Sequence, residues 1–307
     1  MTSVIIPTYK RPSQIKRAIL SVLNQSYKDF EILVIDDDQE NEFNIEQEIA
    51  LIGDHRVLYL KNERTKGGNG ARNTGVVNAK GKYIAFLDDD DIWLKDKLFL
   101  QYERMQTLDE TWAGCYCGWK VEQNTFLNGQ EGDLFEAFLT HQHRFGASST
   151  LFIRRSVFDK VGLWDEDLIR YQDYELMARI YKEYLFAHVN KVLVDVDGHN
   201  IPNLNKIKQA STKFVKKIEK LTEDNLTLQG YFKSHLYRSQ AVLYALNGEA
   251  NEMFKLILSS LKVKMLSPKK YIACFTYLLN YYTFKKPFGT HRKYMTEIFA
   301  KTTSNKS

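Results

Sequence analysis

The segment Glu31-Ile32-Leu33-Val34-Ile35-Asp36-Asp37 is an apolar run that stops at carboxylates. Similar short runs occupy Ser3–Ile6, Val57–Leu60 and Lys82–Leu87, with amphipathic or glycine-rich segments between them. Strands that are apolar throughout, rather than at every second residue, are typical of parallel sheets whose two faces are both covered by helices. The pattern therefore predicts an α/β fold in which helices sandwich a mostly parallel sheet.

Helical segments connect these strands. Apolar residues recur at helical spacing after Pro12-Ser13, which predicts an amphipathic helix, and further helices are expected at Ile45–Leu51 and Ala71–Ala79. The pattern beyond Asp91 predicts the second half of the same domain, with helices at Lys95–Leu108 and Asp173–Tyr184 and strands at Ala113–Glu122, Thr150–Ile153 and Ala187–Val196.

A loop from Gly198 to Asn205 marks the expected domain boundary. We predict a catalytic domain at residues 1–203 and a basic helical C-terminal region at 204–307, with a helical hairpin in Ala241–Pro268. The net charge of +5 divides unevenly: residues 204–307 hold 19 Lys and Arg against 6 Asp and Glu, and residues 1–203 hold 24 against 32. The two parts are expected to face different partners.

The composition bears on localisation. The first residues show neither a basic segment nor an apolar stretch of a signal peptide. The longest charge-free run, Tyr271 to Phe284, is about 21 Å long as a helix, whereas spanning a bilayer takes about 30 Å. Three cysteines are few for 307 residues, which favours a reducing compartment. We expect a cytoplasmic protein that does not cross a membrane.

Four consecutive carboxylates, Asp88 to Asp91, follow the predicted strand Lys82–Leu87. They repel one another unless a cation offsets their charge, and oxygen ligands suit Mg²⁺ or Mn²⁺. A solvated acidic turn that caps the next helix is the alternative. Asp36-Asp37-Asp38 ends the second strand in the same way, and ligands in open α/β sheets bind at the carboxyl ends of strands. A polar loop is the alternative there.

The glycine-rich Gly67-Gly68-Asn69-Gly70 matches neither the dinucleotide-binding fingerprint nor the P-loop. It does precede a helix, whose N-terminus favours anions, and it places Arg72 within reach of a phosphate or a base.

Together these segments resemble the inverting nucleotide-sugar glycosyltransferases of family 2, which have the GT-A fold. The similar stretches are Ser3-Val4-Ile5-Ile6-Pro7-Thr8-Tyr9, Leu33-Val34-Ile35-Asp36-Asp37, Gly70-Ala71-Arg72-Asn73-Thr74-Gly75 and Phe86-Leu87-Asp88-Asp89-Asp90-Asp91-Ile92-Trp93. The resemblance covers about residues 2–197, and the four motifs are specific as a set.

The resemblance implies roles for individual residues. The implied nucleotide-binding residues are Pro7, Thr8, Tyr9, Asp37, Arg72, Asp88 and Asp89. Asp88 and Asp90 would form the D-x-D pair, with Asp90 on a Mn²⁺ or Mg²⁺ ion that bridges the donor diphosphate and Asp88 on the ribose or a metal-bound water. Asp173 would be the catalytic base. Gln172 beside it, where the family more often has Glu, would contact the acceptor.

Three further residues are implied only by position. Ser148 and Ser149 lie in a segment similar to the floor of the family's acceptor site, although a small-residue turn explains them equally well. His199 lies where related enzymes carry a loop that contacts diphosphate or metal, and an exposed loop histidine is the alternative.

The chemistry agrees with Asp173 as base, because an acceptor hydroxyl must lose a proton as it attacks the anomeric carbon. The alternative is that Asp173 caps the helix Asp173–Tyr184. We therefore expect a metal-dependent inverting glycosyltransferase that uses a UDP-sugar and a glycan or polyprenyl-linked acceptor, in cell-surface polysaccharide synthesis.

Two other functions remain open. A nucleotidyltransferase would also need paired carboxylates and a metal, but Lys10-Arg11 is a poor match to its activating motif. A catalytically silent scaffold that binds nucleotide-sugar or glycan is the other.

The basic tail could bind an anionic membrane surface at the inner face of the membrane, which suits a lipid-linked acceptor. The alternatives are a solvated surface or a homodimer interface. Nucleic acid is not expected as a partner, because no nucleic-acid-binding motif accompanies the charge.

Overall fold

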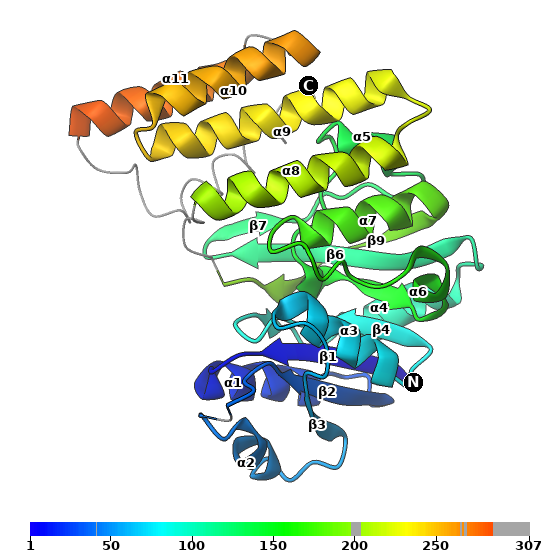
Figure 1. Ribbon diagram of the computed structural model, residues 1–307. Coiled ribbons are helices and arrows are strands. Elements are labelled where there is room, and N and C mark those ends of the chain that lie inside the picture. Colours follow the sequence, from blue (N-terminus) through cyan, green and yellow to red (C-terminus); the bar gives the residue numbers. More distant parts are fainter. Residues whose placement is uncertain (41, 198–203, 265, 267–268, 285–307) are drawn as a thin grey trace. The chain divides into compact units, whose positions relative to one another are not determined.

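The computed structural model describes residues 1–40, 42–197, 204–264, 266 and 269–284 (Figure 1). The described chain divides into two compact units. The first comprises Met1–Phe135 and Arg144–Asp197, and the second comprises Glu136–His143 and the described residues after Asp197. The predicted division had assigned Glu136–His143 to the first domain. This segment belongs to the second unit, where the His141 ring stacks on His235 with centroids 5.0 Å apart.

A single twisted sheet forms the centre of the first unit. Its strands are β1 (Thr2–Thr8), β2 (Phe30–Asp36), β3 (Val57–Lys61), β4 (Tyr83–Phe86), β5 (Ile92–Trp93), β6 (Trp112–Val121), β7 (Asn124–Phe126), β8 (Phe152–Arg154) and β9 (Leu185–Asp195). Their order is β3-β2-β1-β4-β8-β6-β9-β5, and β7 pairs with β6. β1, β2, β3 and β4 pair in parallel, whereas β8 is antiparallel to both of its neighbours.

Helices cover both faces of the sheet, as its continuous apolar strands predicted. They are α1 (Pro12–Leu23), α2 (Ile45–Ala50), α3 (Gly68–Asn78), α4 (Lys97–Gln106), α6 (Ser156–Val161) and α7 (Gln172–Glu183). Val4 and Ile6 of β1 share a core with Ile15 and Ile19 of α1, while the intervening Ile5 faces α3 at Gly75. Successive strand residues point to opposite faces, so α1 and α3 lie on opposite sides. The predicted α/β sandwich is confirmed.

The start of α3 differs from the prediction. The helix begins at Gly68 rather than Ala71, so the glycines lie in its first turn instead of before it. At Gly70 a Cβ atom would lie 1.9 Å from the carbonyl oxygen of Thr65. Glycine is therefore required inside this turn by close backbone approach, although glycine in a helix is otherwise unfavourable.

The second unit is helical. It contains α5 (Phe135–Leu139) from Glu136 onward, together with α8 (Leu204–Leu221), α9 (Leu226–Leu246), α10 (Ala250–Val263) and α11 (Lys269–Phe284). α9 and α10 form the predicted hairpin and turn at Gly248, which has a φ of 75°. The core of the second unit includes Val242, Met253 and Tyr271. None of the helices in the described residues is long and apolar enough to span a membrane.

Candidate active site

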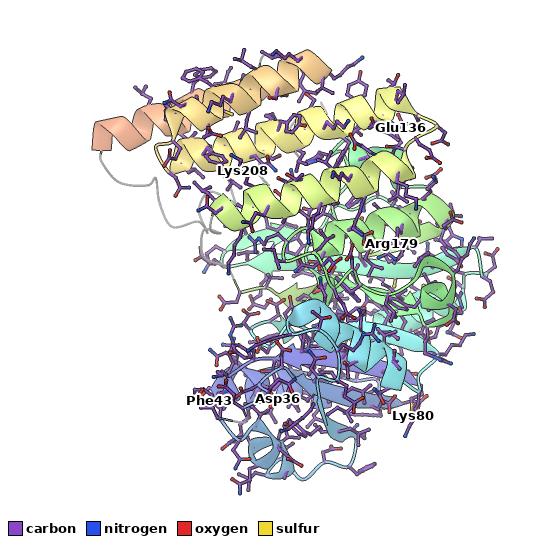
Figure 2. The ribbon with its side chains drawn as sticks, in the orientation of Figure 1. Asp36, Phe43, Lys80, Glu136, Arg179 and Lys208 are labelled. Carbon is purple, nitrogen blue, oxygen red and sulfur yellow. The ribbon has the colours of Figure 1, made fainter. Side chains whose placement is uncertain are left out.

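The carboxyl ends of β1, β2 and β4 meet at one edge of the sheet. In register, Thr8 pairs with Asp36, and Ile5 pairs with Phe86, two residues before the acidic motif begins at Asp88. Figure 2 labels Asp36 at this edge. Parallel strands bring the residues that follow them to the same side, so both predicted carboxylate clusters lie there.

Asp89 and Asp90 are held from the β1 side of this edge. The Thr8 hydroxyl donates to Asp89 at 2.9 Å. The Arg11 guanidinium donates to Asp89 at 2.9 Å and to Asp90 at 3.0 Å. Burial raises the pKa of Asp89, and Arg11 and Thr8 act against that rise. Arg11 was not among the predicted site residues.

Asp88 is held from the other side. It accepts a hydrogen bond from Arg72 at 2.6 Å, and the Ser148 hydroxyl lies 3.2 Å from the same carboxylate oxygen. The backbone N–H of Asp88 donates to the Ser149 hydroxyl at 3.0 Å. Ser148 and Ser149 are completely buried. Both serines therefore position the acidic motif through Asp88.

Asp91 is a structural member of the motif. It is completely buried and accepts hydrogen bonds from the Ser149 hydroxyl at 2.5 Å and from the backbone of Asp197 at 2.9 Å. Burial, reinforced by the neighbouring charge of Asp88, raises the pKa of Asp91 well above its ordinary value. Asp91 therefore fixes the turn and contributes less negative charge than its neighbours.

Arg72 lies at the centre of the site. Its side chain is buried, which lowers its pKa, but the carboxylates of Asp88, Asp173 and Asp89 more than compensate and the net shift is upward. Its guanidinium lies 4.9 Å from the Trp164 ring. Among the described residues, Arg72 Nε and Trp164 Nε1 are buried donors with no hydrogen-bond partner.

Asp37 supports the glycine-rich loop. One carboxylate oxygen accepts from Asn62 at 2.6 Å and the other accepts from the backbone of Gly67 at 2.8 Å. Pro7 is half-buried and Tyr9 is 42% exposed, with the Lys66 ammonium 5.2 Å from the Tyr9 ring centroid. Tyr9 thus offers an accessible aromatic face near this loop.

Asparagines on α3 hold the segment between α6 and α7, which leads to Asp173. Asn73 exchanges hydrogen bonds with the backbone of Trp164, both at 2.9 Å, and Asn69 donates to the carbonyl of Leu168 at 2.7 Å. Arg179 anchors α7 to the same connection by donating to the Leu163 carbonyl at 2.8 Å (Figure 2).

The helix-cap alternative for Asp173 is wrong. The N-cap of α7 is Tyr171, with a φ of 62°, and no side chain caps this helix. Asp173 and Gln172 instead lie in the first turn, and Asp173 acts electrostatically on Arg72. Helix capping therefore does not explain why Asp173 lies close to Arg72.

Comparison with known proteins identifies the fold and family. The family model described as "Glycosyl transferase family 2" matches residues 3–162. The chain belongs to glycosyl transferase family 2. A UDP-Glc:alpha-D-GlcNAc-diphosphoundecaprenol beta-1,3-glucosyltransferase of Escherichia coli is 38% identical over 130 residues, which are 42% of this chain and 50% of the relative.

Solved structures confirm the GT-A fold of this glycosyltransferase. TarS residues 1–349 of Staphylococcus aureus, in complex with UDP, matches 84% of this chain and 88% of that chain, with 16% identity and a TM-score of 0.52. A mannosyltransferase from Pyrobaculum calidifontis, in complex with GDP-Man and Mn²⁺, matches 98% and 84%, with 14% identity and a TM-score of 0.59.

The donor set of the glycosyltransferase fits a hard divalent cation. Asp88 and Asp90 present carboxylates with exposed fractions of 21% and 16%. Within the part of the chain that the structure describes, no three His, Cys, Asp or Glu side chains gather as a metal cage. Mg²⁺ and Mn²⁺ sites that use one or two carboxylates and complete their shell with substrate phosphates need no such cage. The predicted ligand His199 lies outside the described residues.

Proposed function

We propose that this glycosyltransferase moves a sugar from a UDP-sugar to a hydroxyl of a glycan or lipid-linked oligosaccharide, with inversion at the anomeric carbon. The observation that carries the proposal is the gathering of Asp88 and Asp173 around the buried Arg72. These residues come from three separate segments and are the ones that donor binding and proton removal require.

Asp173 is the proposed general base. A carboxylate within hydrogen-bond reach of the acceptor hydroxyl takes up its proton as the oxygen attacks the anomeric carbon. Asp173 acts electrostatically on Arg72, so the proposed base lies close to the arginine that also binds Asp88. The hydrogen bonds of Asn73 with the backbone of Trp164 hold the segment that precedes α7, which supports a fixed position for Asp173.

Asp88 and Asp90 are the proposed ligands of Mn²⁺ or Mg²⁺. Such an ion, bound with the donor, supplies Lewis-acid stabilisation of the charge on the diphosphate leaving group. The proposed nucleotide pocket consists of the glycine-rich loop that Asp37 supports, together with Pro7, Thr8, Tyr9 and Asp89.

UDP is proposed as the nucleotide because the Escherichia coli relative is named for UDP-Glc and the TarS fragment binds UDP. The Pyrobaculum mannosyltransferase binds GDP-Man, so GDP is the competing outcome. The acceptor of the Escherichia coli relative is an undecaprenyl diphosphate derivative. A polyprenyl-linked acceptor in polysaccharide synthesis is proposed for this chain on that basis.

The chain is proposed to act at the inner face of the membrane, in the cytoplasm, without a nucleic-acid partner. Residues 1–203 without Glu136–His143 are the proposed catalytic domain. Residues 204–307 are the proposed basic region, which carries a net charge of +13.

A thermal-shift panel tests donor binding. UDP, GDP, CDP and dTDP are compared with Mn²⁺ and with EDTA, and a selective ligand raises the melting temperature by mass action. We expect the largest rise with UDP and Mn²⁺. The donor-site proposal fails if no nucleotide raises the melting temperature in either condition.

Asp173→Asn separates an enzyme from a silent binder. Turnover should fall by roughly 10²–10⁴-fold, while the UDP-dependent thermal shift persists. Asp167→Asn is the matched control, because Asp167 is exposed in the same connection. Equal turnover of the two variants would exclude Asp173 as the base.

A further inference from the structure

Helix α10 is apolar on two adjacent faces. Met253 and Ile257 are buried in the core of the helical unit. Phe254, Leu258 and Leu261 lie at i, i+4 and i+7, and their exposed fractions are 46%, 56% and 40%. At 3.6 residues per turn these three side chains form one stripe along the helix.

Helix α11 repeats the arrangement. Tyr271, Cys274 and Tyr277 are buried, whereas Ile272, Phe275 and Leu279 are exposed. The centroids of the Phe254 and Phe275 rings lie 5.9 Å apart, so the two stripes adjoin. We call the six residues Phe254, Leu258, Leu261, Ile272, Phe275 and Leu279 the α10–α11 apolar patch.

Lysines flank the patch on α10. Lys255 and Lys262 are exposed and lie about 100° around the helix from Phe254 and Leu261, on the same side of the stripe. Residues 204–307 as a whole have 19 basic against 6 acidic residues. Large adjoining exposed apolar side chains usually mark an interaction surface. Leucine and phenylalanine bordered by lysine are typical of helices that lie in the interface of an anionic bilayer.

We propose that the α10–α11 apolar patch inserts into the interfacial layer of an anionic lipid bilayer, with Lys255 and Lys262 against the headgroups. The inference rests on the proposed function, because a lipid-linked acceptor is presented at such a surface. Anionic lipid is favoured over a second copy of this chain, because two regions that each carry a charge of +13 repel each other, whereas lipid headgroups attract both.

Vesicle co-sedimentation of the full chain tests this directly. Phosphatidylcholine vesicles are compared with vesicles that also contain phosphatidylglycerol, at low and at high salt. We expect binding to the phosphatidylglycerol vesicles that weakens with salt. The variant Leu258→Ser/Phe275→Ser should bind at least tenfold more weakly, and Lys255→Gln/Lys262→Gln should lose the preference for anionic lipid.

Leu226→Ser is the matched control, because Leu226 is 74% exposed in the same unit but lies outside the patch. The proposal is overturned if the wild type does not sediment with anionic vesicles, or if Leu258→Ser/Phe275→Ser binds as well as Leu226→Ser. It is also overturned if sedimentation velocity shows a lipid-free dimer that Leu258→Ser/Phe275→Ser dissociates while vesicle binding is unchanged.

The UDP thermal shift of each variant keeps the two proposals apart. All variants in the patch should retain the wild-type shift, because the patch lies in a different unit from the donor site. A variant that loses vesicle binding but keeps the UDP thermal shift tests the patch proposal alone. Absence of a UDP shift in the wild type concerns the proposed function alone.

Discussion

Replacement of Lys97 by methionine is predicted to stabilise the catalytic unit at neutral pH. Lys97 is completely buried at the start of α4. Its ammonium donates to Gln101 Oε1 at 2.6 Å and lies 4.0 Å from the Trp93 ring centroid. Burial lowers the pKa of Lys97 from its ordinary 10.5 to about 8, and the neighbouring Cys117 and Cys115 only partly oppose this.

The magnitude follows from the two pKa values of Lys97. The folded state binds this proton less tightly than the unfolded chain, so the charged lysine destabilises the fold by about 3 kcal/mol at pH 7. Loss of the hydrogen bond to Gln101 offsets about 1 kcal/mol of this. Lys97→Met should therefore raise the free energy of unfolding by about 2 kcal/mol at pH 7.

The gain should disappear at high pH. As pH rises from 8 to 10.5 the unfolded lysine still holds its proton while the folded one has lost it, so the wild type becomes more stable relative to the variant. At pH 10 the penalty has fallen to about 1 kcal/mol or less, which the lost hydrogen bond cancels. The two proteins should then be equally stable.

Urea unfolding at pH 7 and pH 10, followed by tryptophan fluorescence, measures this difference. All four tryptophans lie between residues 93 and 164, so their signal reports the catalytic unit alone. Lys95→Met is the control at an exposed lysine. A gain for Lys97→Met that is the same at both pH values would refute the titration of a buried ammonium as its cause.

Three further predictions concern the site. Gly70→Ala should lower the melting temperature by several degrees or prevent folding, whereas Gly230→Ala, where the nearest atom to the new methyl is 3.7 Å away, should stabilise α9 by about 0.5–1 kcal/mol in a thermal melt. Asn73→Ala should free the backbone of Trp164, seen as faster amide exchange there, and lower kcat; unchanged exchange would contradict this. Asp88→Asn should abolish the Mn²⁺-dependent part of the UDP thermal shift, and a wild-type response to Mn²⁺ would remove Asp88 from the metal ligands.

The sheet and its main helices were predictable, because each apolar run could be stably buried in only one kind of secondary-structure element. Glu31–Ile35 is apolar on both faces and therefore had to be covered twice, which the structure confirms in β2. Short elements were missed. β7 has three residues and α5 five, too few to establish a hydrophobic period. The first turn of α3 was missed because glycine disfavours helices unless a close contact requires it.

The site was predictable where a motif ends a strand, and less so where it depends on contacts between distant residues. Asp88 and Arg72 were both expected at the site, but their direct hydrogen bond was not. Arg11 precedes α1 in a segment without a motif, so only the fold reveals that it reaches Asp89. Ser148 was expected to contact the acceptor, yet it is buried against Asp88.

The acidic motif shows why charge arithmetic along the sequence was incomplete. Four adjacent carboxylates were expected to need a divalent cation, but Arg72 and Arg11 pair with three of them and supply two compensating positive charges, and burial favours the protonated form of Asp91. The motif is therefore electrostatically tolerable without bound ligands. On the proposed function, a cation at Asp88 and Asp90 must share these carboxylates with two guanidinium groups, which opposes its binding. The donor diphosphate adds negative charge, which makes this sharing favourable. The metal should therefore bind the protein–donor complex more tightly than the free protein, and the donor should likewise bind the protein–metal complex more tightly.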